Sequence, residues 1–298
     1  MRRFAVVLAG LGLVLLFMTG AAYLYFKGQI PPVQLETERF VLRADADVLW
    51  QPFQQELRAA TTRFDRLLRP ASDPPRLEVA IIDDPKQMNA VALYVAIRQS
   101  MGTPAEGLPL PYPTPRLVSM LLGEPQTEAG PAAGRRSLGH EAGHWLIRLH
   151  LLRQPEGPEH LQEREKAIPG WLREGIAGFC ESTEARLGAL LRMRTAIADS
   201  ASADALDWRR FLVATPPAVQ RLSWAHQDAR MNGTQDALSE LYYAQALLLV
   251  EYLEARHPRM VRKWIGRDPV AVTAESELLL QDQAAFHAWI LTVPPLSL

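Results

Sequence analysis

The chain is poor in cysteine and has no excess of either charge. Cys180 is the single cysteine, so no disulfide can form within the chain and the paired-cysteine zinc patterns are excluded. A metal site would have to use histidine and carboxylate ligands. The 32 lysines and arginines nearly balance the 33 aspartates and glutamates, which gives a net charge of −1. This balance supplies no overall field for nucleic acid or an anionic membrane surface, so we predict no nucleic-acid partner and expect a local functional site.

One segment departs from an otherwise ordinary globular composition. Of the 298 residues, 48% are hydrophobic and 22% are charged, which excludes a disordered or collagen-like chain. The exception is residues 4–26, a run of 23 uncharged residues that is long enough to cross a bilayer as a helix. The flanking Arg2, Arg3 and Lys27 predict a single-pass membrane protein with its N-terminus in the cytoplasm and its folded domain outside, in the periplasm if the source is bacterial. A cleaved signal peptide is the alternative, but the apolar run continues past the small residues and favours an uncleaved anchor.

Three consecutive parts are predicted along the chain. They are a transmembrane anchor at 1–27, a linker at 28–36 and one domain at 37–298, strand-rich over 37–123 and helical over 137–298. The predicted fold class is therefore α+β, with a transmembrane helix ahead of a small sheet and a helical C-terminal part. Strands are expected at 39–42, 76–82 and 116–122, helices at 48–68, 86–99, 137–152, 169–193 and 237–255, and a proline-rich loop at 102–115.

The segment His-Glu-Ala-Gly-His at 140–144 matches the HExxH pattern. At about 100° per residue, positions four apart lie about 40° from each other on a helix, so His140 and His144 can reach one ion. Ser137 is a suitable N-cap for this helix. Two histidines leave a catalytic zinc site incomplete, because such a site takes three protein ligands and a water.

Glu174 is the candidate third ligand. It lies 30 residues beyond His144, and the Pro- and Gly-containing stretch 154–158 gives the chain room to turn and return a second helix alongside the first. Gly175 and Gly178 would let that helix approach the HExxH helix closely. The carboxylates that could replace Glu174 are Glu181 and Glu184.

These motifs together resemble the gluzincin metallopeptidases, and more closely the peptidase MA-like families. The resemblance rests on HEAGH at 140–144, on WLREGIA at 171–177 and on the Tyr-Ala-Gln-rich segment at 242–258, and it spans residues 37–267. It implies a gluzincin-like domain that binds Zn²⁺ through His140, His144 and Glu174. Many relatives also carry an acidic residue four positions after the third ligand, where it orients a zinc-bound histidine, and this chain has Gly178 there. Glu181, one turn further on, or another carboxylate would have to replace it.

The same resemblance implies roles for two further side chains. Glu141 would be the catalytic carboxylate, acting as general base towards a zinc-activated water, and Tyr243 would present a phenol to the tetrahedral intermediate, with Tyr242 as the alternative. The expected function is that of a membrane-anchored zinc metallopeptidase acting on peptide or protein substrates. The alternative is a catalytically inactive, gluzincin-like binding or scaffold protein tethered to the membrane.

Overall fold

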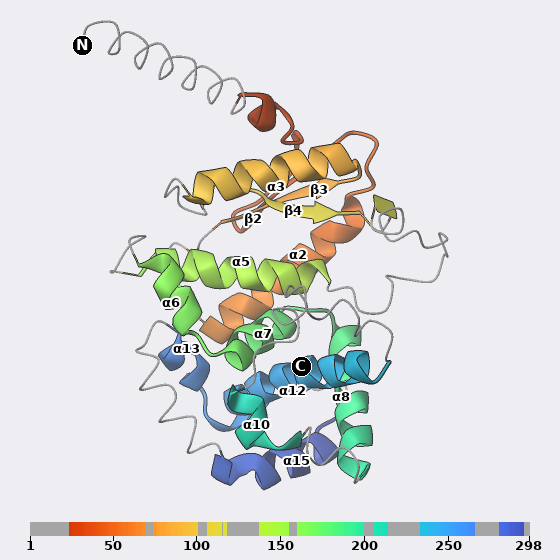
Figure 1. The fold of residues 1–298 in the computed structure, drawn as a ribbon, viewed down its shortest axis with the longest axis vertical. Coiled ribbons are helices and arrows are strands. Elements are labelled where there is room, and N and C mark those ends of the chain that lie inside the picture. The colour runs from red at the N-terminus through yellow and green to blue at the C-terminus, as the bar shows by residue number, and fades with distance from the viewer. Residues whose placement is uncertain are drawn as a thin grey trace, which may run out of the picture. The chain divides into compact units, whose positions relative to one another are not determined.

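The computed structural model of the chain describes residues 24–68, 74, 76–100, 106–114, 116–117, 137–154, 160–199, 206–213, 233–265 and 280–294. The chain divides into two compact units. One comprises Met1–Trp50 and Arg76–Pro131, and the other comprises Gln51–Pro75 and Ala132–Leu298. The first unit holds a small sheet and one long helix, and the second is built from helices (Figure 1).

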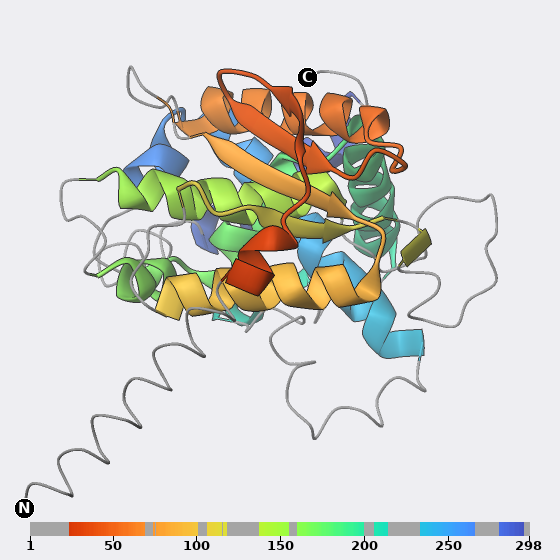
Figure 2. The same cartoon turned by 90° about the horizontal axis from the view of Figure 1, so that it is seen from above.

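A four-stranded sheet forms the first unit. Its strands lie in the order β1 (Val33–Glu36), β2 (Phe40–Ala44), β3 (Leu77–Ile82) and β4 (Leu110–Pro113). The β1–β2 pair is antiparallel, and β2–β3 and β3–β4 are parallel. The strands run side by side, with α3 (Pro85–Ser100) along one face (Figure 2). Val91 of α3 packs against Ala80 and Ile82 of β3, as expected for an apolar strand buried inside a sheet.

The last of the three predicted strands lies elsewhere in the chain, as β4. It lies at Leu110–Pro113, inside the stretch predicted as a loop, whereas residues 116–117 of the predicted strand 116–122 are helical and residues 118–122 lie outside the described residues. Pro111 and Pro113 have no N–H to donate to a neighbouring strand, so the sequence around them is typical of a loop. They are tolerated because β4 stands at the end of the described sheet and pairs only with β3.

The described part of the second unit consists of helices joined by turns. They are α2 (Gln51–Leu68), α5 (Leu138–Leu152), α6 (Leu161–Ala167), α7 (Gly170–Phe179), α8 (Thr183–Ala198), α10 (Trp208–Val213), α12 (Gly233–Arg256), α13 (Met260–Trp264) and α15 (Gln283–Thr292), with a short 3-10 turn at Leu280–Asp282. α7 packs against α5 on one side and against α12 on another (Figure 1). The predicted helix 137–152 is confirmed, because α5 covers Leu138–Leu152 and Ser137 is its N-cap.

The single helix predicted at 169–193 is two helices. α7 ends at Phe179 with Cys180 as its C-cap, and α8 begins after Ser182, whose side chain accepts a hydrogen bond from the Ala185 N–H. Apolar periodicity runs through both helices and hides the break. The serine N-cap is the local signal that could have revealed it.

The predicted transmembrane helix and fold class need correction. Among the described residues, no helix is both long enough and apolar enough to cross a membrane. Residues 4–23 of the predicted span lie outside the described residues, and residues 24–28 are helical. The longest described helix, α12, has 24 residues but carries Glu240, Glu251 and Glu254. The finding contradicts the anchored α+β class and the single-pass localisation, and leaves a mostly helical structure with a small four-stranded sheet.

Candidate metal centre

The first two turns of α5 hold the two histidines of the motif. Ser137 caps the helix, and its hydroxyl accepts a hydrogen bond from the His140 N–H at 3.2 Å. The rings of His140 and His144 lie edge to face, with centroids 4.9 Å apart, and their Nε2 atoms are separated by 3.2 Å. The side chain of His140 is only 3% exposed. One turn of helix therefore aims two imidazole nitrogens at the same point.

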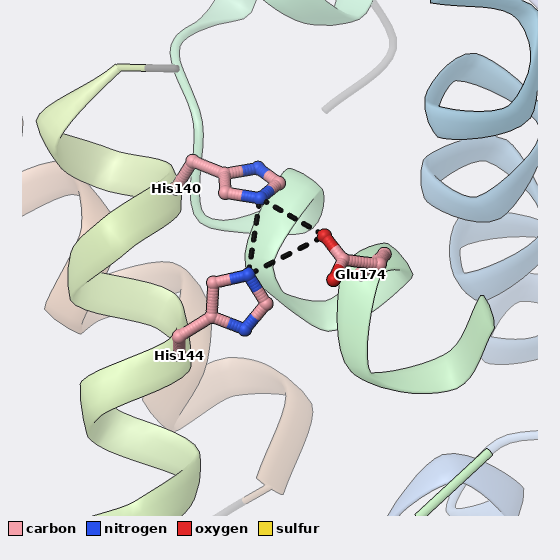
Figure 3. A group of neighbouring side chains, drawn as sticks. All are labelled: His140, His144 and Glu174. Carbon is pink, nitrogen blue, oxygen red and sulfur yellow. Dashed lines mark hydrogen bonds and ion pairs between the residues drawn. The ribbon is translucent and has the colours of Figure 1, made fainter. Parts of the chain in front are cut away.

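Glu174 of α7 faces these nitrogens. Its Oε2 atom lies 3.3 Å from Nε2 of His140 and 3.4 Å from Nε2 of His144 (Figure 3). The residue is 4% exposed, and Nε of Arg173 lies 4.0 Å from its Oε1 atom. The three ligand atoms all lie within 4.8 Å of one another, so this buried group could hold a metal ion. The predicted third ligand is thus brought to the two histidines.

Burial lowers the pKa of His144 below its ordinary value of 6.5, and the neighbouring His140 acts in the same direction. The carboxylates of Glu174 and Glu141 oppose this shift. The charge of Glu141 thus acts on His144, although Glu141 is not a member of the three-residue group. A lowered pKa keeps the imidazole neutral near pH 7, which is the state that can bind a metal.

Close contacts between helix backbones position the ligands. A Cβ atom added at Gly143 of α5 would lie 2.7 Å from the Cα atom of Ala177, and one added at Gly175 of α7 would lie 2.4 Å from the Ala246 carbonyl oxygen. Gly178 also faces α12, with Leu247 as its neighbour. Gly175 and Gly178 were predicted to face the HExxH helix. They face α12 instead, and Gly143 provides the close approach on the HExxH helix.

The two tyrosines of α12 occupy different environments. The Tyr243 ring lies edge to face with the His140 ring, with centroids 6.2 Å apart. Tyr242 packs against Phe211 at 5.1 Å, and its buried hydroxyl has no hydrogen-bond partner in the described part of the chain. Burial raises the pKa of Tyr242, which keeps it protonated. Tyr243 is therefore the tyrosine whose ring lies against a histidine of the three-residue group.

The two alternative carboxylates also lie in different places. Glu184 is exposed in the first turn of α8. Glu181 reaches the other ring nitrogen of His140, with Oε1 2.8 Å from Nδ1. Glu181 is one of the two carboxylates predicted as substitutes for Glu174, and it is also the residue predicted to replace the acidic side chain missing at Gly178. The atom that it approaches was not predicted. Cys180, beside it, is a buried free thiol whose pKa is raised by burial, as expected for an inert cysteine.

Comparisons of the chain with protein-family models, with curated proteins and with solved structures find no match.

Proposed function

We propose that this chain is a zinc-dependent metallopeptidase with His140, His144 and Glu174 as its metal ligands. The spacing of the three donor atoms carries the proposal. A tetrahedral zinc ion with bonds of about 2.0–2.1 Å holds its ligands about 3.3–3.4 Å apart. The three separations in the structure are 3.2, 3.3 and 3.4 Å. Two imidazoles and one carboxylate are also a ligand set used by catalytic zinc sites, which keep one position open.

The site residues fit peptide hydrolysis. When bound, a zinc ion would polarise a scissile carbonyl and lower the pKa of a water molecule. Glu141 lies one residue from a ligand histidine, and its carboxylate accepts the proton of the attacking water and passes it to the leaving nitrogen. Tyr243, whose ring contacts His140, donates its hydroxyl proton in a hydrogen bond to the oxygen on which negative charge develops. The substrate class is therefore a peptide or protein.

Metal analysis and a cleavage assay on the full-length chain test the proposal. We expect about one zinc ion per chain by elemental analysis, and cleavage of a mixed peptide library detected by mass spectrometry. Glu141→Gln should keep the zinc and lose cleavage by 10²-fold or more, the size of contribution typical of general-base catalysis. Glu184→Gln, which removes an exposed carboxylate away from the ligands, is the matched control and should retain both properties.

Each other outcome has a distinct meaning. Bound zinc with cleavage that does not depend on Glu141, or with no cleavage, would contradict the peptidase and leave a metal-binding protein. Iron in place of zinc would point to the oxygen chemistry of two-histidine, one-carboxylate iron sites. No bound metal would contradict the proposal altogether.

A further inference from the structure

A pocket lies beside the turn that joins α7 to α8. It has a volume of about 140 Å³, which is space for several water molecules, and residues of α2, α8, α12 and that turn form its wall. Arg66 and Thr183 in this wall are exposed, whereas Arg186 is buried, so the pocket runs inwards from the surface. All of the lining residues belong to the helical unit.

Three arginines and two glutamates set the charge of this wall. Both glutamates already have partners. Nε of Arg186 lies 2.8 and 2.9 Å from the two carboxylate oxygens of Glu251. Glu181 directs Oε1 at Nδ1 of His140, which does not line the pocket. The two arginines of α2 therefore provide positive charge that neither glutamate of the wall pairs with.

Arg63 and Arg66 are these two residues. They lie three positions apart on α2, so their side chains leave the same face of the helix, and neither forms an ion pair with any described residue. Nη2 of Arg63 donates a hydrogen bond to the Thr183 hydroxyl at 3.1 Å, which holds the guanidinium against the start of α8. Nη1 of Arg63 is buried and has no acceptor in the described part of the chain. A buried N–H without an acceptor costs free energy, which an oxygen of a bound anion would recover.

We propose that this pocket binds a phosphate group, either as inorganic phosphate or as the phosphoryl group of a small molecule. A guanidinium presents its N–H groups in a planar fork that matches phosphate oxygens, and these charge-assisted hydrogen bonds are stronger than neutral ones. A phosphoryl group carries a charge of about −1.5 to −2 at pH 7, which balances Arg63 and Arg66 better than a single carboxylate does. The inference does not depend on the proposed metal site, so either one can fail without the other.

Isothermal titration calorimetry of the full-length chain with inorganic phosphate tests the site, with chloride keeping the ionic strength constant. We expect saturable binding whose affinity is the same before and after a chelator removes any bound metal, because the pocket does not include the metal ligands. Acetate should bind much more weakly than phosphate. Methyl phosphate identifies the source of the group, since affinity at least equal to that of phosphate assigns the site to phosphorylated small molecules and weaker binding assigns it to free phosphate.

Substitutions on α2 test the residues of the pocket. Arg63→Gln should weaken phosphate binding about 10- to 100-fold, the effect of losing a hydrogen bond between charged groups. Arg63→Lys keeps the charge but loses the planar fork, so its affinity should lie between those of Arg63→Gln and the unchanged chain. Arg66→Gln changes an exposed residue and should weaken binding without unfolding the chain. Arg58→Gln is the matched control, because Arg58 is an exposed arginine of the same helix that does not line the pocket, and it should leave the affinity unchanged.

Four results would overturn the proposal. They are the absence of saturable phosphate binding to the unsubstituted chain, binding of acetate as tight as that of phosphate, binding that disappears when the metal is removed, and an equal loss of affinity in Arg58→Gln and Arg66→Gln. If circular dichroism shows that Arg63→Gln does not fold, Arg66→Gln decides alone, and an unchanged phosphate affinity in that variant would refute the site.

Discussion

Replacing Gly175 by alanine should destabilise the protein, although alanine favours helices. Gly175 lies within α7, next to the ligand Glu174. An added Cβ atom would lie 2.4 Å from the Ala246 carbonyl oxygen and 2.7 Å from Cγ2 of Val250. The valine side chain can rotate away, but the carbonyl belongs to the backbone of α12. The two helices would have to separate.

Two opposing terms set the size of the effect. Alanine in place of an interior helical glycine contributes about 1 kcal/mol of favourable propensity. Inserting a methyl group into a filled contact costs about 1–3 kcal/mol, and more where backbone must move. Since the 2.4 Å contact involves backbone, we expect the upper part of that range and a net loss of about 1–2 kcal/mol. Moving α7 also displaces Glu174, so zinc affinity should fall.

Gly188→Ala is the matched control for this prediction. Gly188 is also inside a helix, α8, but its added Cβ atom would meet only Nη1 of Arg192 at 3.1 Å, the mobile end of a long side chain. This variant should gain up to about 1 kcal/mol and keep its metal affinity. Urea unfolding of the metal-free proteins, followed by tryptophan fluorescence, measures both changes. Equal stabilisation of the two variants would refute the argument that the α7–α12 contact is closed to a methyl group.

Three other perturbations have defined outcomes. Glu251→Ala leaves the buried Arg186 without the carboxylate whose two oxygens lie 2.8 and 2.9 Å from its Nε, and it should lower the free energy of unfolding in urea by about 3–5 kcal/mol. Replacing both residues by Met should lower it much less, and equal losses in the two variants would contradict this prediction. Burial lowers the pKa of His150 below 6.5, so this side chain binds a proton more readily in the unfolded chain than in the folded one, and the free energy of unfolding should decrease as the pH falls from 7.5 to 5.5. His150→Gln should show a smaller decrease, and equal decreases in the two proteins would contradict the prediction. Ser137→Ala removes the cap of α5 and should cost about 1 kcal/mol in thermal unfolding, while Ser137→Asp should not; no difference between the two would exclude the capping role.

The parts of the site that depend on local spacing could be predicted from the sequence. His140 and His144 lie one helical turn apart, and Ser137 begins their helix, so both the element and its ligand face follow from neighbouring residues. Glu174 was predicted from its motif and lies with the histidines. Their shared function remains a prediction, since spacing alone does not identify the ion or the reaction.

Long-range packing set the features that the sequence did not predict. The strand β4 contains two prolines and forms because it pairs with β3, about thirty residues earlier in the chain. The faces of Gly175 and Gly178 depend on which helix packs beside α7, and periodicity within α7 does not specify that neighbour. The contact from Glu181 to Nδ1 of His140 likewise depends on the turn after α7 and on Gly139, which are far apart in sequence.

The contact between Gly143 and Ala177 has a consequence for the ions that the centre can accept. Two helix backbones meet there with only one methyl group between them. Such a contact has no rotamers to exchange, so the distance between the histidine helix and the glutamate helix changes only if a whole helix slides. The group of His140, His144 and Glu174 should therefore bind ions selectively by their radius. A calcium ion needs six to eight oxygen ligands at about 2.3–2.6 Å, so it should bind poorly because of its size as well as its ligand preference.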